Sequence, residues 1–123
     1  MDVSQEYIDM CRKAYEIQEL WIPNDDKQDV VWNGDCIDHW YILGNKESYV
    51  WLPRQDQLQE FIIRGDTLSK LQGVWIFVNS FKLEPASMEQ LWLMSIMWQK
   101  YSKKWNGTTW EEKNHEETIQ SQN

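Results

Sequence analysis

The strongest structural signal in the chain is the stretch from Ser87 to Trp105, SMEQLWLMSIMWQKYSKKW. Ser87 and Gln90 have the spacing of a capping box, which satisfies free backbone N–H groups at the start of a helix. Apolar residues follow at intervals of three and four, as on one face of a helix. We therefore predict a helix from Met88 to about Trp105, ended by the left-handed conformation that Asn106-Gly107 favours.

The first half of this helix is apolar nearly all round. Trp92, Leu93 and Ile96 fall on the side that otherwise holds Glu89 and Lys100. A helix without a polar face is either deeply buried or presents an apolar patch to another molecule. Burial between a sheet and the first helix is one interpretation, and exposure of these three side chains at a partner or subunit contact is the other.

A second helix is predicted at the N-terminus, between Ser4, a residue type that caps helices, and Pro23, which forces the preceding residue out of helical geometry. Its apolar side chains form one continuous arc, within which Gln18 is the single polar residue. The members of the arc are Tyr7, Ile8, Met10, Cys11, Ala14, Tyr15, Ile17 and Trp21. A polar connector follows at 24–29.

Strands are predicted from apolar runs at 30–32, 36–43, 49–52 and 74–83. Asn33-Gly34 joins the first two, because both residues tolerate the positive φ of a tight hairpin turn. Trp-Asn-Gly occurs again at 105–107, where we expect a helix cap instead. Alternation along the last strand places Trp75 on its core-facing side.

The expected fold class is α+β, with an antiparallel sheet of three to four strands, the two terminal helices and a short middle helix after Pro53. A chain of 123 residues supports one core. We therefore expect a single domain over 1–110. Residues 111–123, which are mostly polar and acidic, are expected to form a disordered tail.

Composition limits the classes of partner. The net charge is −8, from 12 Lys and Arg against 20 Asp and Glu, which disfavours direct binding to nucleic acid or to an anionic membrane. No apolar run approaches the ~20 residues of a membrane span, and the N-terminus lacks the pattern of a secretory signal. A cytoplasmic protein with two buried, reduced thiols, Cys11 and Cys36, is expected.

No constellation of residues demands a particular chemistry, so we predict no cofactor or metal and favour a non-enzymatic protein over an enzyme. Cys36 and His39 are three apart in a predicted strand and point to opposite faces, which prevents them from forming a nucleophile–base pair. Five carboxylates lie within 25–38, but they lack the ligand order of a calcium loop. A solvated acidic loop is the simplest interpretation, followed by an acidic patch facing a partner.

Three motifs together resemble a family of small proteins encoded by phages and prophages of Gram-positive bacteria. They are WLPRQDQLQE at 51–60, SMEQLWL at 87–93 and WNGTTW at 105–110, and the first helix, ending CRKAYEIQELW at 11–21, fits the same family. The resemblance covers most of residues 7–112. It implies a phage-related, intracellular context and brings no catalytic residues.

Three functions are compatible with these observations. The leading hypothesis is a non-enzymatic phage or prophage accessory protein that binds another protein, or itself, through Trp92, Leu93 and Ile96. The first alternative is a small-molecule or nucleotide binder or enzyme, with an aromatic pocket and a polar group such as Asp38, His39 or Arg54. The second alternative is an acidic mimic of nucleic acid, which requires the carboxylates of 25–38 and of the tail to share one face.

The nine tryptophans divide along the same lines. Most are explained by the expected core or by a sheet covered on both faces; these are Trp21, Trp32, Trp40, Trp51, Trp75, Trp98, Trp105 and Trp110. Trp92 is the one that the expected fold does not require.

Overall fold

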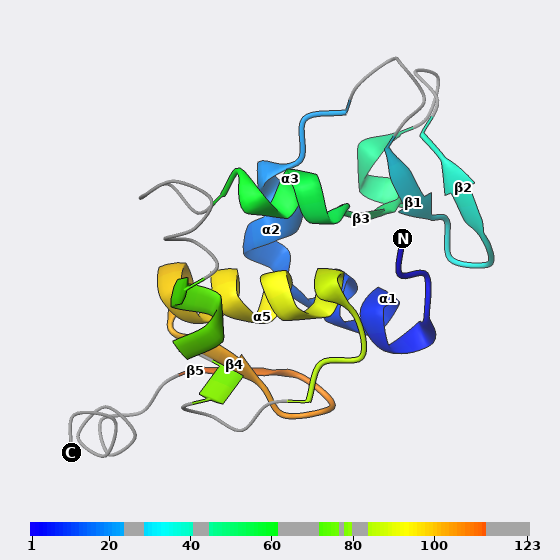
Figure 1. Ribbon diagram of the computed structural model, residues 1–123. Coiled ribbons are helices and arrows are strands. Elements are labelled where there is room, and N and C mark those ends of the chain that lie inside the picture. Colours follow the sequence, from blue (N-terminus) through cyan, green and yellow to red (C-terminus); the bar gives the residue numbers. More distant parts are fainter. Residues whose placement is uncertain (24–28, 41–44, 62–71, 77, 80–83, 113–123) are drawn as a thin grey trace.

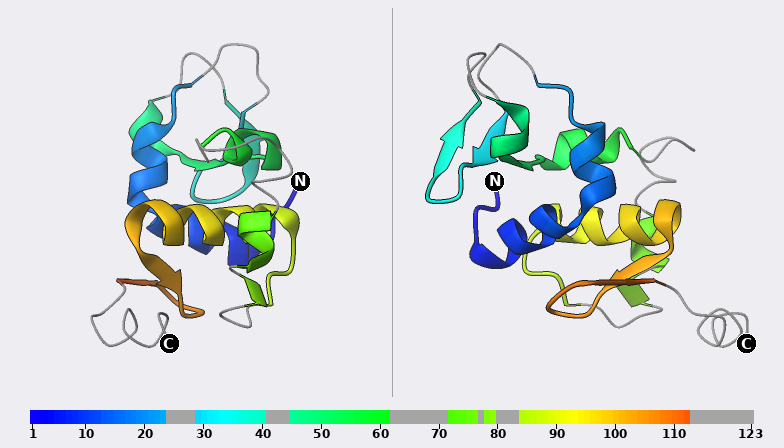
Figure 2. Two further views of the ribbon diagram at one scale, coloured as in Figure 1. Left: turned by 60° about the vertical axis from the view of Figure 1, so that its left-hand side comes forward. Right: turned by 180° about the vertical axis from the view of Figure 1, so that it is seen from behind.

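The computed structural model describes residues 1–23, 29–40, 45–61, 72–76, 78–79 and 84–112. These residues form an α+β fold in three layers, which confirms the predicted class (Figure 1 and Figure 2). A three-stranded sheet and a short helix lie on one side, and a two-stranded hairpin lies on the other. The helices α1 (Gln5–Lys13) and α5 (Met88–Tyr101) cross between them.

The predicted N-terminal helix is interrupted. It consists of α1 and α2 (Tyr15–Leu20), separated by Ala14, whose φ of −87° and ψ of 72° are not helical. In a continuous helix the Cys11 carbonyl would accept the N–H of Tyr15. Here it accepts the N–H of Ala14 at 3.1 Å and the side-chain amide of Gln18 at 3.1 Å. The Gln18 side chain therefore takes over a bond that the helix would otherwise make.

Gln18 also attaches the helices to the sheet. Its Nε2 donates to the Trp51 carbonyl at 2.9 Å, and its Oε1 accepts the Trp51 N–H at 2.8 Å. Trp51 is the middle residue of β3 (Val50–Leu52), which lies at the edge of the sheet. An edge strand leaves one row of backbone groups unpaired, and Gln18 satisfies a donor and an acceptor of that row.

The sheet has the order β2-β1-β3 with both pairings antiparallel. The central strand β1 (Val30–Trp32) pairs with β2 (Ile37–His39) in the predicted hairpin, but through a loop of residues 33–36 in which Gly34 and not Asn33 has a positive φ. It also pairs with β3, which follows the short 3-10 helix η1 (Lys46–Ser48). The strand predicted at 36–43 is thus observed over 37–39, and residues 41–44 lie outside the described part of the chain.

The helix α3 (Gln55–Gln59) follows Pro53, as predicted. Tyr7 of α1 donates its buried hydroxyl to the Pro53 carbonyl at 2.6 Å, which ties α1 to the junction of β3 and α3. At the start of α5, Ser87 Oγ accepts the N–H of Gln90 at 3.1 Å, as the capping box predicts.

The end of α5 differs from the prediction. The helix stops at Tyr101, one turn early, because Ser102 adopts the left-handed conformation with a φ of 56°. The chain then forms a hairpin of β4 (Lys103–Trp105) and β5 (Trp110–Glu112). Glu111 and Glu112, which the sequence assigned to the tail, therefore belong to a strand, and residues 113–123 lie outside the described residues.

Both Trp-Asn-Gly sequences form the same four-residue hairpin loop. The N–H of Asn33 donates to Cys36 O at 3.1 Å, and the N–H of Asn106 donates to Thr109 O at 3.0 Å. Each asparagine Oδ1 accepts the two N–H groups that follow the glycine, at 2.8–2.9 Å. The glycine φ is 99° in the first loop and 100° in the second, so each loop needs Gly. The expectation of a helix cap at 106–107 is therefore wrong.

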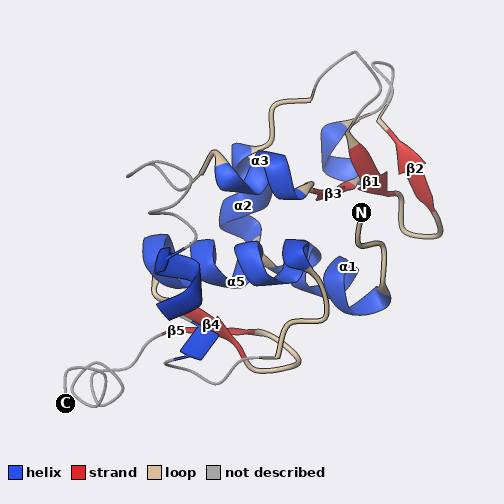
Figure 3. Ribbon diagram, in the orientation of Figure 1, coloured by secondary structure: helices blue, strands red, loops and turns tan. Residues whose placement is uncertain are grey.

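The strand predicted at 74–83 is also wrong over its described residues, 74–76 and 78–79. Residues 72–76 and 78–79 are helical, and 77 and 80–83 lie outside the described residues (Figure 3). A short apolar run fits a helix as well as a strand, and the helical period of 3.6 changes which side chains face inward. Val74 is buried and Val78 packs against the core. Trp75, one position on from Val74, points into solvent.

The tryptophans fill most of the core. Six of the nine are buried, namely Trp21, Trp40, Trp51, Trp92, Trp105 and Trp110. Trp32 and Trp98 are half-buried and pack against them. The indole N–H of Trp21 bonds the buried Asp29 carboxylate at 3.0 Å, while those of Trp105 and Trp110 bond Glu6 and the Met10 carbonyl of α1 at 2.9 and 3.0 Å. The hairpin is thereby fixed to α1.

Replacing Gln18 by Leu should lower the free energy of unfolding by about 3 kcal/mol, because two backbone groups of Trp51 lose their bonds. Urea unfolding followed by circular dichroism measures the change. The exposed Gln5→Leu variant, on the preceding helix, is the matched control and should change stability by less than about 0.5 kcal/mol. Equal effects of the two substitutions would contradict the role of Gln18.

Candidate functional site

The side chains predicted to bind a partner are buried in the monomer. Trp92, Leu93 and Ile96 have no exposed surface, so the expectation that they are exposed is wrong. The reason is that α5 packs against α1, α3 and β4, which cover it from several directions. Of the two explanations for a helix apolar all round, burial holds for this one.

The exposed tryptophan is Trp75. Its side chain is 68% exposed and the neighbouring Ile76 is 63% exposed, whereas the other eight tryptophans are buried or half-buried. Trp75 borders an almost wholly apolar groove of about 340 Å³, which is also lined by Val74, Val78, Pro85 and Leu91. The groove lies between α5 and the helical segment that begins at 72, and Gly73 of that segment lies against Gln99 of α5.

A second cavity, of about 370 Å³, lies where the α1–α2 helices meet η1 and β3. Three aromatic side chains line it, Tyr15, Trp21 and Tyr49, together with the cationic Arg12 and Lys46. We refer to it as the aromatic pocket. A small-molecule binder, which is the first alternative from the sequence, requires a pocket of this kind. The polar residues predicted for that pocket were Asp38, His39 and Arg54.

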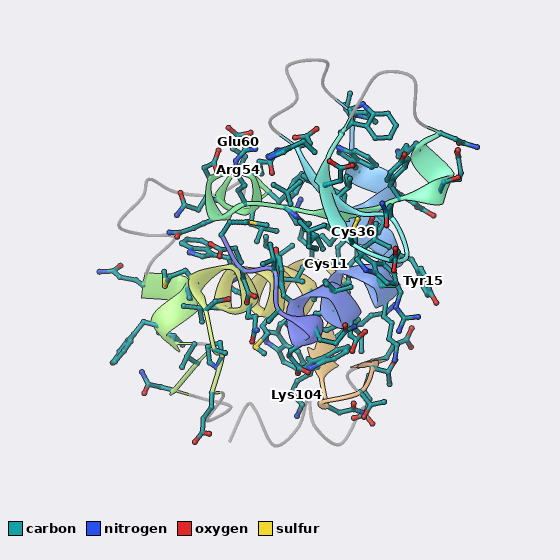
Figure 4. The ribbon with its side chains drawn as sticks, turned by 90° about the vertical axis from the view of Figure 1, so that its right-hand side faces the viewer. Cys11, Tyr15, Cys36, Arg54, Glu60 and Lys104 are labelled. Atoms are coloured by element: carbon teal, nitrogen blue, oxygen red, sulfur yellow. The ribbon has the colours of Figure 1, made fainter. Side chains whose placement is uncertain are left out.

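Those other residues do not converge. His39 and Leu52 pair with Val30 from opposite sides of β1, which places β2 and the end of β3 on opposite edges of the sheet. Asp38 lies beside His39 and accepts its N–H at 2.8 Å. Arg54 follows β3 and forms an ion pair with Asp56 at 3.1 Å. Figure 4 shows Arg54 well apart from Tyr15.

The two cysteines have different surroundings. Cys11 is buried between the helices, as predicted, and burial raises the pKa of its thiol far above the ordinary value, which leaves it protonated and unreactive (Figure 4). Cys36 is exposed in the first Asn-Gly loop, so the expectation that it is buried is wrong. Its sulfur lies 3.4 Å from Asn33 Nδ2.

The carboxylates of 25–38 do not share one described surface. Asp29 is buried and accepts bonds from Trp21 and Gln57. Asp25, Asp26 and residues 113–123 of the predicted tail, on which the nucleic-acid mimic hypothesis also depends, lie outside the described residues. Across the described part of the chain, no three His, Cys, Asp or Glu side chains gather as metal ligands, and no helix has the length and hydropathy to cross a membrane.

Comparison with known proteins yields no relative. The chain matches no protein-family model, no curated protein and no solved structure.

Sequence reasoning missed Trp75 and the aromatic pocket for different reasons. Val74 and Val78 are four residues apart, the spacing of one helical face, and Trp75 lies off that face. This spacing is the signal that could have identified Trp75. Tyr15, by contrast, belonged to the predicted apolar arc. It is 68% exposed because the break at Ala14 changes the direction of the helix, and no local pattern predicts that break.

Trp92→Ala should lower the free energy of unfolding by about 3–5 kcal/mol, since it leaves a large cavity in the core. Trp75→Ala should lower it by less than about 0.5 kcal/mol, because an exposed side chain leaves none. Chemical unfolding of both variants checks the pair. A large loss in Trp75→Ala with little change in Trp92→Ala would reverse the assignment of core and surface.

Proposed function

We propose that the chain is a non-enzymatic module that binds another protein, and that the docking surface is the groove beside Trp75. The observation that carries the proposal is the exposure of Trp75 and Ile76 over an apolar groove. Exposed tryptophan beside a pocket is typical of the residues that dominate binding energy at protein interfaces. Trp92, where the sequence predicted such a surface, is buried, whereas Trp75 is exposed.

The charge of the chain indicates the kind of partner. At a net charge of −8, two copies repel one another, whereas a basic protein is attracted. We propose a partner segment that inserts a large apolar side chain into the groove and carries Lys or Arg beside it. Glu84, exposed next to Pro85 of the groove, is one acidic group at this rim.

The cellular context in this proposal rests on sequence motifs. The resemblance of residues 51–60, 87–93 and 105–110 to small phage and prophage proteins supports a phage accessory protein that acts in the host cytoplasm. The partner is then a host or phage protein present during infection or prophage induction.

Affinity capture from infected or induced host cells tests the proposal with three baits: the wild type, Trp75→Ala and Tyr15→Ala. Tyr15 is the matched control, because its side chain is also 68% exposed and lies in the other cavity. A specific partner should be recovered by the wild type and by Tyr15→Ala, and lost with Trp75→Ala. With that partner purified, Trp75→Ala should raise Kd about 30-fold, the equivalent of about 2 kcal/mol.

Equal recovery by Trp75→Ala and the wild type would contradict the proposed surface. Stronger binding at high salt would contradict the proposed basic partner, because screening weakens attraction between opposite charges.

A further inference from the structure

The aromatic pocket has the dimensions and the rigidity of a ligand site. Its volume of about 370 Å³ lies within the ~300–1,000 Å³ range of small-molecule sites. Two of the three rings that line it, Trp21 and Tyr49, are fixed by packing. Trp21 stacks on Trp51 at 6.2 Å and meets Trp40 edge-on at 5.0 Å, and Tyr49 meets Trp40 edge-on at 5.3 Å. The walls formed by Trp21 and Tyr49 therefore exist before any ligand binds.

One wall is available to an incoming ring. Tyr15 is 68% exposed at the pocket, and Tyr49 is half-buried. Exposed aromatic rings arranged around a cavity favour a flat, apolar ligand, which they contact face-on or edge-on.

The charge of the pocket distinguishes between ligand types. Lys46 is held in place: its Nζ donates to the Trp21 carbonyl at 2.7 Å and lies 6.0 Å from the centre of the Trp21 ring. An ammonium group has three donors, so Lys46 can also bind an anion. Because this cation already occupies the face of Trp21, a cationic ligand would be repelled from it.

The remaining charges limit the charge of the ligand. Arg12 also lines the pocket, but Glu19 and Glu47 do so as well, and both are exposed. Among the described residues of the lining, two cations and two carboxylates balance one another. A single negative charge can be held at Lys46, whereas a polyphosphate such as that of a nucleoside triphosphate would be repelled by the two carboxylates.

We propose that the aromatic pocket binds a small, planar aromatic monoanion, such as an aromatic carboxylate. The ring lies against Tyr15 and Tyr49, and the anionic group bonds Lys46 Nζ, whereas Arg12 already pairs with Asp9 at 3.4 Å. Among the residues that the structure describes, the site shares no lining residue with the groove beside Trp75, so it is distinct from the surface proposed for protein binding.

Calorimetric titration with 2-naphthoate tests the proposal, with 2-naphthylmethanol and 2-naphthylmethylammonium as neutral and cationic analogues of the same ring. On the wild type, 2-naphthoate should bind saturably with a Kd on the order of 1 mM or tighter. The neutral analogue should bind at least about fivefold more weakly, and the cation should not bind measurably, since only the anion pairs with Lys46. This comparison requires no variant to fold.

Variants then locate the site. Lys46→Met and Tyr15→Ala should each weaken 2-naphthoate binding at least about fivefold. Lys100→Met is the matched control, because Lys100 also lies over an aromatic ring, 5.8 Å from the centre of Phe61. It should bind like the wild type, as should Trp75→Ala. Absence of saturable binding, binding of the cation as tight as the anion, or unchanged affinity in Lys46→Met with native circular dichroism would overturn the proposal.

Discussion

The two hydrogen bonds between the Gln18 amide and the backbone of Trp51 are the constraint on which the arrangement of this protein depends. They close the free edge of β3 with a side chain rather than with another strand. The same amide donates a hydrogen bond to the Cys11 carbonyl. The helix breaks at this point, at Ala14, and α2 takes a new direction. Trp21, directly after α2, thereby reaches the rings of Trp40 and Trp51.

This arrangement also explains why the aromatic pocket is found where it is. A continuous helix would place Tyr15 in the same arc as Cys11 and Ile17, which are buried. The break moves Tyr15 to the surface and leaves a hollow between α2 and η1. One polar residue in an apolar arc thus determines both the attachment of the sheet and the shape of a cavity.

The sequence was sufficient where a local pattern has one physical solution. The Ser87–Gln90 cap and the helix after Pro53 were predicted correctly, since each depends on neighbours in the chain. The sequence was insufficient where a pattern has two solutions. The run at 74–78 fits a helix or a strand, and Trp-Asn-Gly at 105–107 fits a cap or a hairpin. For Trp92 burial was one of two interpretations, and only the packing of α1, α3 and β4 around α5 decides between them.

The central claim is that the fold uses eight of the nine tryptophans and leaves Trp75 to solvent. Fluorine NMR of protein labelled with 5-fluorotryptophan tests it most directly, because the shift between H₂O and D₂O reports the exposure of each ring. The resonance that disappears in Trp75→Phe should show the largest solvent shift of the nine, and that of Trp92 should show almost none. A Trp75 resonance that does not respond to the solvent would contradict the account.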